Sequence, residues 1–450
     1  MRRLEGEEGT WWRYGEASRL LLRARRGDQR GLNEAKALAA DITRRRPDWS
    51  RGALLEGYLR EVIGEPTTAA DAYLQAFRGG ERRSSVIERL VRLLTEQGRL
   101  DEADDVLRTF QQRQATLSPE LARLGAEIAL RQRGNERAVE LARLAVPADA
   151  RDYPKLIWLG QVLALAGQPS EAEEVLRRAV RQRGDLAETW LALIAQLARM
   201  DQVREAETVR EEMRRHLPAE QTPLALAICA EVLGQLANAE QSYRQCLART
   251  PDDDLVLQRA ARFYLRLNQS QQAEPLLRRM IAPEANVLAA NQAWARRQLA
   301  LLLAFPQKEG ANGRREPTGE YVLPAGSRRP FAEALALLDE NQRLKQDGFL
   351  DQRARLLVQA TQAEARPTAL RLLEKSGKAT PFTTEELVCL VQLYEANGDL
   401  SLANERMLDL LALDRNNPAY LAQHIDRLLR RGRKDEARPW IVRLQKVKEK

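Results

Sequence analysis

The chain has 450 residues, of which 44% are hydrophobic, 5% aromatic and 30% charged. Alanine, leucine, arginine and glutamate dominate, all of them good helix formers, and alternating β-branched runs are almost absent, which argues against a β-rich fold. The 72 basic residues exceed the 64 acidic ones by a margin that is small for this length. The excess permits an acidic partner but does not by itself indicate nucleic acid binding.

The residues that usually carry chemistry are scarce. Cys229, Cys246 and Cys389 form no CxxC pair, and with only His216 and His424 besides there are too few ligands for a zinc site. We interpret the thiols as small buried hydrophobes, His424 as a packing residue and His216 as a cation at a helix C-terminus. No catalytic residue, metal or cofactor is therefore expected, and we predict that the protein is not an enzyme.

The sequence also gives an expectation about compartment. No stretch approaches the roughly 18 apolar residues that a membrane span requires. No apolar segment follows Arg2 and Arg3, so the start does not resemble a signal peptide. A cytoplasmic protein is expected. Trp11 and Trp12 precede the first repeat with no obvious capping helix, and if the chain is an excerpt of a longer array, there is room for a targeting signal upstream.

A recurring turn followed by an alanine sets the organisation of the chain. In Gly98-Arg99-Leu100-Asp101-Glu102-Ala103, glycine ends one helix in the left-handed conformation, and an acidic residue starts the next. Related turns start at Gly167, Gly398 and Gly432. Counted along the chain, these anchoring alanines are 35, 69, 103, 138, 172, 206, 239, 273, 334, 369, 403 and 437. Apart from one interval of 61, their spacing is 33 to 35 residues.

This period resembles that of the tetratricopeptide repeat family. The family's helix positions are matched by Trp190, Leu193 and Ile194, by Leu156, Leu159, Gly160 and Leu163, and by Leu387, Leu390, Val391 and Tyr394; prolines 47, 218 and 251 close repeats. The resemblance implies an all-α fold: a right-handed α-solenoid of about twelve helix-turn-helix repeats.

The interval of 61 residues divides the chain into three segments. Residues 1–304 would hold repeats one to eight and the first helix of the ninth, near Glu284–Ala304. Residues 305–330, rich in proline and glycine, are predicted to form a flexible insertion loop rather than a binding element. Residues 331–450 would hold the second helix of repeat nine, beginning at Phe331, and repeats ten to twelve.

Five arginines lie five residues after an anchoring alanine and would form a stripe on the second helices. An acidic residue precedes each by three or four positions, which predicts ion pairs along an exposed helix face and a neutralised surface rather than a nucleic-acid site. The pairs are Asp104 with Arg108, Glu140 with Arg143, Glu173 with Arg177, Glu240 with Arg244 and Glu274 with Arg278.

By resemblance to the family, the fifth and ninth positions of each first helix line a peptide-binding groove. About half of these positions are apolar, and some are expected to pack against neighbouring helices instead. Neither the lysine and asparagine clamp of chaperone-binding members nor an asparagine ladder is present. The candidate groove residues are Leu54, Tyr58, Arg92, Ile157, Gln161 and Leu191.

The sequence therefore favours a protein–protein interaction scaffold that presents a groove to a peptide or helical partner. The alternative is a regulatory or substrate-recruiting portion of a larger enzyme or of an envelope export or assembly machine. RNA binding is a third hypothesis, and the paired glutamate and arginine pattern argues against it.

Overall fold

The twelve anchoring alanines are all buried: none exposes more than 3% of its surface. The computed structural model describes residues 5–6, 8–113, 117–305, 328–346, 348–379 and 381–448. These residues form twenty-four α-helices and no strand. Successive helices pack as twelve antiparallel hairpins, each with one anchoring alanine in its second helix. The fold is an all-α solenoid of helical repeats, as the 34-residue period predicts.

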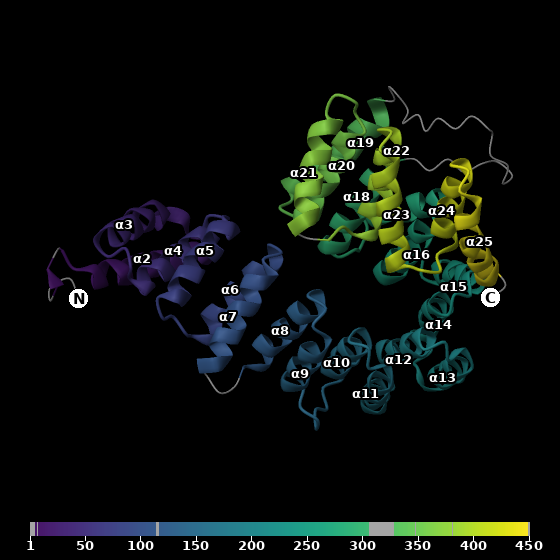
Figure 1. Ribbon diagram of the computed structural model, residues 1–450, viewed down its shortest axis with the longest axis horizontal. Helices are drawn as coiled ribbons and strands as arrows, with labels where there is room; N and C mark the ends of the chain where they lie inside the picture. The colour runs from purple at the N-terminus through teal and green to yellow at the C-terminus, as the bar shows by residue number, and fades with distance from the viewer. Residues whose placement is uncertain are drawn as a thin grey trace. The chain divides into compact units, whose positions relative to one another are not determined.

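The hairpins fall into two compact units, Met1–Arg183 and Gly184–Lys450 (Figure 1). The helices of the first unit are α2 (Thr10–Arg25), α3 (Leu32–Arg45), α4 (Ser50–Val62), α5 (Pro66–Arg78), α6 (Ser84–Glu96), α7 (Leu100–Arg113), α8 (Pro119–Arg131), α9 (Asn135–Ala145), α10 (Tyr153–Leu165) and α11 (Pro169–Gln182).

The second unit continues the same alternation of first and second helices. Its helices are α12 (Ala187–Arg199), α13 (Val203–His216), α14 (Thr222–Val232), α15 (Leu236–Arg249), α16 (Asp254–Arg266), α17 (Ser270–Met280), α18 (Ala289–Ala304), α19 (Arg328–Arg343), α20 (Phe349–Ala360), α21 (Arg366–Ala379), α22 (Thr384–Ala396), α23 (Leu400–Leu413), α24 (Pro418–Arg430) and α25 (Lys434–Lys448).

The turn inside each hairpin uses one backbone geometry. Gly98, Gly167, Gly398 and Gly432 have φ between 71° and 82°, the left-handed conformation predicted for them. The same turn position is also left-handed where the residue is Arg133, Asp201 or Asn268, with φ of 61°, 57° and 57°. The hairpin geometry therefore dictates the conformation even where the residue type disfavours it. For this reason, a search of the sequence for glycine finds fewer turns than the chain has.

The ninth hairpin differs from the others because its two helices are separated by residues 305–330. α18 begins at Ala289 rather than near Glu284; a turn in which the Ala285 N–H donates to the Ala282 carbonyl oxygen precedes it, and the carboxylate of Asp254 accepts the Leu288 backbone N–H at 3.0 Å just before the helix starts. α19 begins at Arg328, three residues before the predicted start at Phe331. The predicted insertion loop lies, for residues 306–327, outside the described residues.

A buried polar network joins α18 to α19 and α20. The Asn341 side chain has no exposed surface and donates hydrogen bonds to the Ala293 carbonyl at 3.0 Å and to Asp351 Oδ1 at 2.9 Å. Arg297 forms an ion pair of 2.9 Å with the other oxygen of Asp351. Since buried polar groups are costly unless paired, this network fixes the register of a hairpin that lacks the usual short turn.

Overpacking at an anchoring alanine should be costly. Ala172→Leu places three extra carbons where the two helices of a hairpin touch, and we expect a loss of about 1–3 kcal/mol of stability. Arg244→Leu, at a side chain that is 65% exposed, should change stability by less than about 0.5 kcal/mol. Urea denaturation followed by circular dichroism measures both, and equal shifts would show that the assigned register is wrong.

Substitution of alanine for two glycines within helices should change the stability of the fold in opposite directions. A Cβ on Gly57 would lie 2.4 Å from Cε1 of the Tyr73 ring, so Gly57→Ala should destabilise by about 1–3 kcal/mol. A Cβ on Gly15 in α2 meets nothing within 4 Å, so Gly15→Ala should stabilise by about 0.5–1 kcal/mol through helix propensity. Thermal melting of the two variants beside the wild type tests the pair.

Candidate functional site

First helices of several neighbouring hairpins contact one another, and α6 reaches α4 through the ion pair of Arg89 with Glu61. In the first unit α2 contacts α4, and α8 contacts both α6 and α10. The second helices instead pack on the first helix that follows them, as α3 does on α4 and α5 on α6. Because the first helices lie closer together, we call their exposed side the inner face of the stack and that of the second helices the outer face. A long partner segment would find its most continuous surface on the inner face.

The predicted groove residues on α4 have different environments. Leu54 is completely buried in the core, so it can support the inner face but cannot touch a partner. Tyr58 is half-buried, and its ring packs edge-on against Tyr73 with 5.6 Å between centroids. Burial raises the pKa of the Tyr58 hydroxyl, which is therefore neutral at physiological pH.

A polar group behind Tyr58 was missed by the sequence reasoning. The Tyr73 hydroxyl donates to the carboxylate of Glu61, and the Arg89 guanidinium lies 3.3 Å from the same carboxylate. Arg89 also lies 5.5 Å above the Tyr58 ring. Burial and the bond to Glu61 raise the pKa of Tyr73. These contacts tie α4, α5 and α6 together and orient the Tyr58 ring.

A repeated spacing could have revealed part of that group. Glu61 lies eight residues before Ala69, and Tyr73 lies four residues after it. Glu231 and Tyr243 have the same spacing about Ala239, and the Tyr243 hydroxyl donates to Glu231 at 2.6 Å. The bond joins the first and second helices of a hairpin in both places.

The other predicted groove residues are accessible. Arg92 on α6 is exposed and forms an ion pair of 2.7 Å with Glu88. On α10, Ile157 is half-buried and Gln161 exposed. Leu191 on α12 is half-buried and belongs to the second unit, so it is considered separately from the other five.

A second arginine and aromatic pair lies between α8 and α10. The Arg123 guanidinium is 5.2 Å above the ring of Trp158, which is half-buried beside Ile157, and its Nε is 3.4 Å from Glu127. Trp158 was not among the predicted groove residues. The inner face of the first unit thus carries half-buried aromatic and aliphatic side chains on α4 and α10, with ion-paired arginines on α6 and α8.

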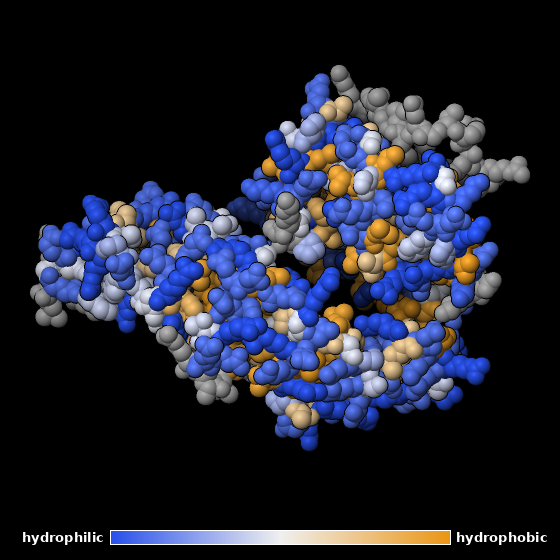
Figure 2. Space-filling model, in the orientation of Figure 1, coloured by the Kyte–Doolittle hydropathy of each residue, from blue (hydrophilic) through white to orange (hydrophobic). Residues whose placement is uncertain are grey.

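The predicted arginine stripe on the outer face is neutralised. Four of the five pairs form as expected, with nitrogen to oxygen distances of 2.6 Å for Arg108 and Asp104, 2.8 Å for Arg177 and Glu173, 2.6 Å for Arg244 and Glu240, and 2.8 Å for Arg278 and Glu274. The prediction for Arg143 is wrong: its partner is Glu171 of the next hairpin, at 2.8 Å, rather than Glu140. In Figure 2 the visible surface is predominantly hydrophilic, and hydrophobic residues form small separate patches.

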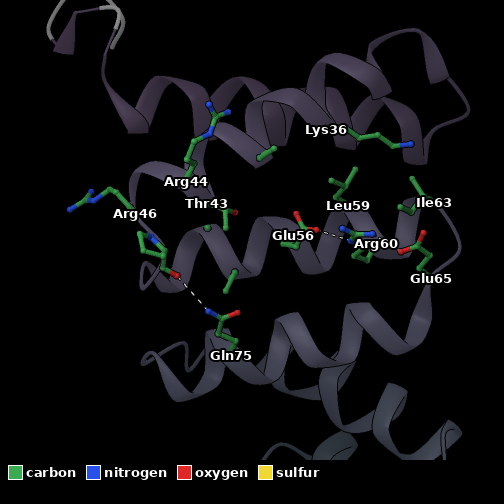
Figure 3. Close-up of a pocket in the computed structure, with 14 residues that line it drawn as sticks. Lys36, Thr43, Arg44, Arg46, Glu56, Leu59, Arg60, Ile63, Glu65 and Gln75 are labelled. Carbon is green, nitrogen blue, oxygen red and sulfur yellow. Dashed lines mark hydrogen bonds and ion pairs between the residues drawn. The ribbon is translucent and has the colours of Figure 1, made fainter.

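A pocket of about 640 Å³ opens on the outer face between α3 and α5, with α4 as its floor (Figure 3). The Arg60 guanidinium in its wall lies 2.6 Å from Glu56 and 2.6 Å from Glu65, so these charges satisfy one another. A pocket of about 500 Å³ has the same position between α21 and α23 over α22. Such openings follow from the separation of the second helices and need no bound ligand to explain them. We therefore place the candidate site on the inner face.

The cysteine and histidine side chains, which could be nucleophiles or metal ligands, are buried or packed against other side chains. All three cysteines are buried, as the sequence predicts. His424 is also buried, with its ring edge-on to Trp440 at 4.8 Å, and burial lowers its pKa. His216 ends α13, stacks on Trp190 at 5.6 Å and places Nδ1 2.8 Å from the Glu212 carbonyl oxygen. Within the described ranges, no three metal-binding side chains gather as a site, and no helix is long and apolar enough to cross a membrane.

Comparisons with known proteins point to the same repeats. The family profile described as "Tetratricopeptide repeat" matches residues 155–195, and one described as "PPR repeat" matches residues 188–216. None of the curated proteins is similar enough in sequence to match the chain.

Among solved structures, the chain resembles the C-terminal part of a TPR repeat-containing protein from Cytophaga hutchinsonii, at 11% identity and a TM-score of 0.39, over 54% of this chain and 97% of that one. It also resembles a tetratricopeptide repeat protein from Parabacteroides merdae, at 11% identity and a TM-score of 0.34, over 68% of this chain and 96% of that one.

The native thiols should be unreactive. Burial raises the pKa of Cys229 to about 12, and it raises those of Cys246 and Cys389 as well. Because the thiolate is the reactive form, Ellman's reagent at pH 8 should modify the folded protein far more slowly than the protein in guanidinium chloride, where all three thiols should react. A thiol that reacts at the same rate in both conditions would show that its site is open.

Proposed function

Because the chain belongs to the tetratricopeptide repeat family, we propose that it is a protein-interaction scaffold that binds an amphipathic helix or an extended apolar peptide along the inner face of its first unit. The observation that carries this proposal is the set of accessible side chains on α4, α6, α8 and α10, of which α8 contacts α6 and α10 and α6 reaches α4 through Arg89. Tyr58, Ile157 and Trp158 supply apolar surface, while Arg92 and Arg123 supply charge between them. Recognition of a helix in a groove needs this combination of apolar anchors and flanking charges.

Tyr58 is the best single anchor. Aromatic residues that are partly buried before binding lose little conformational freedom on contact and often contribute most of the binding energy. Its ring is already held by Tyr73 on one side and Arg89 on another, so it is presented in a fixed orientation. Arg92, whose side chain is 56% exposed, would orient an acidic residue of the partner.

Affinity capture with the purified chain as bait, followed by mass spectrometry, would identify a partner, and variants would then locate its site. Tyr58→Ala and Ile157→Asp should each weaken binding by about tenfold or more, because they remove an anchor or place a charge on the apolar surface. Tyr58→Phe keeps the ring and should bind nearly as well as the wild type.

Arg108→Glu on the outer face is the matched control. Arg108 is 54% exposed, and its partner Asp104 retains a second arginine, Arg137, at 3.2 Å. This variant should bind the partner with unchanged affinity. Loss of binding in Arg108→Glu together with normal binding in Tyr58→Ala and Ile157→Asp would place the working surface on the outer face and refute the proposal.

A further inference from the structure

One face of α16 in the second unit combines exposed apolar and cationic side chains. Leu255, Arg259 and Arg262 are spaced four and three residues apart, so they lie on the same side of the helix. All three are exposed, and Leu255 retains 51% of its surface. Leu288, at the start of α18, is 70% exposed. The feature of interest is the combination of two exposed leucines with two arginines, since a single exposed leucine is ordinary.

The α16 face is held rigidly against α18. Asp254 accepts hydrogen bonds from the Leu288 backbone N–H at 3.0 Å and from the Asn291 side-chain amide at 2.8 Å. The Gln258 amide donates to the Asn291 side-chain oxygen at 2.7 Å. These bonds fix Leu288 beside the first turn of α16, so the two exposed leucines belong to one preformed surface.

Arg262 stacks on an aromatic ring but has no acidic partner. Its guanidinium lies 4.9 Å above the ring of Trp294, which is buried. In the part of the chain that the structure describes, no carboxylate lies within 4.0 Å of Arg259 or Arg262. Stacking uses the flat face of the guanidinium and leaves its N–H edge free to donate two parallel hydrogen bonds.

The charges around Arg262 favour an added anion. Burial lowers the pKa of Arg262, and the nearby positive charges of Arg259 and Arg297 lower it further, while Glu385 of α22 opposes them. Arg297 is already committed to Asp351 at 2.9 Å. Glu385 acts on Arg262 through its charge without forming an ion pair with it, so the half-desolvated guanidinium would gain a direct partner from an anionic group of a bound peptide.

Two stacked arginines on the inner face of the first unit differ from Arg262 in having a carboxylate beside them. Arg89 stacks on Tyr58 and lies 3.3 Å from Glu61 of α4, and Arg123 stacks on Trp158 and lies 3.4 Å from Glu127 of its own helix. Arg262 has a similar stack, with no carboxylate within 4.0 Å among the described residues.

We propose that Leu255, Arg259, Arg262 and Leu288 form a docking site for a partner peptide in which an acidic residue is flanked by a large apolar residue. A carboxylate of the peptide accepts hydrogen bonds from the free edge of Arg262 and interacts with Arg259. The adjacent apolar side chain covers Leu255 and Leu288. This site is in the second unit and does not depend on the proposed use of the inner face of the first unit.

The composition of the surface favours an acidic peptide over a nucleic acid. A nucleic acid strand presents a phosphate at every nucleotide and needs a tract of cations. Here two arginines without an acidic partner among the described residues adjoin two exposed leucines, and two carboxylates are nearby, Asp254 beside Leu288 and Glu385 within reach of the charge of Arg262. One or two carboxylates beside apolar side chains match that pattern.

Fluorescence anisotropy with a labelled peptide of alternating glutamate and leucine tests the site in the full-length protein. Arg262→Ala should weaken binding by about tenfold, the loss expected for a charge-assisted pair of hydrogen bonds. Leu288→Asp should weaken binding similarly. Arg262 and Leu288 are exposed, so both variants should keep the wild-type circular dichroism spectrum and melting temperature.

Arg244→Ala is the matched control, because it removes an exposed arginine of the second unit whose charge is already paired with Glu240 at 2.6 Å. Its affinity for the peptide should equal that of the wild type. The proposal is overturned if the peptide does not bind at millimolar concentration or if Arg244→Ala and Arg262→Ala weaken binding equally. It is also overturned if an oligouridylate of equal charge binds more tightly and is lost with Arg262→Ala, which would make the site one for nucleic acid.

Discussion

The close approach of the two helices in each hairpin is the constraint on which the rest of the structure depends. Alanine at the contact lets the helix axes approach, and the left-handed turn five residues earlier brings the second helix back against the first. Once these two features are set, the large side chains of each hairpin point toward the next one. Each hairpin therefore buries its apolar surface only when another hairpin stacks on it, which makes the array cooperative.

The layer of first helices is the consequence that matters for function. Contacts such as α2 with α4 and α8 with both α6 and α10 bring helices of different hairpins into one surface, whereas the second helices separate and leave openings such as the pocket over α4. The five arginines of the predicted outer stripe are paired with acidic residues along their own helix or across to the next hairpin. The inner face, with its accessible aromatic and aliphatic side chains, is the surface on which we propose that a partner binds.

In the second unit, a hydrogen bond joins two helices that are far apart in the sequence. The Asn417 side chain caps α24 and also donates to the Arg266 carbonyl oxygen at the end of α16 at 3.1 Å. The Arg266 guanidinium in turn lies 3.3 Å from Glu231 and 3.7 Å from Asp414. Residues about 150 positions apart in the sequence are thus neighbours within one unit. This contact holds the last turn of α16, and with it the α16 face that carries Arg262, against the hairpins near the end of the chain.

The sequence by itself determined the repeat period, the twelve anchoring alanines, the turn geometry and four of the five outer ion pairs. All of these depend on spacings within one hairpin, where helix geometry fixes which residues are neighbours. It did not predict that Leu54 is buried, that Arg143 pairs with Glu171, or that Tyr58 is backed by Tyr73, Glu61 and Arg89. Those relations depend on the angle and offset between successive hairpins, which arise from side-chain packing along the whole stack. The same reason applies to Arg262: its position on α16 is evident from the sequence, but only the tertiary structure shows Trp294 beneath it and, among the described residues, no carboxylate within 4.0 Å.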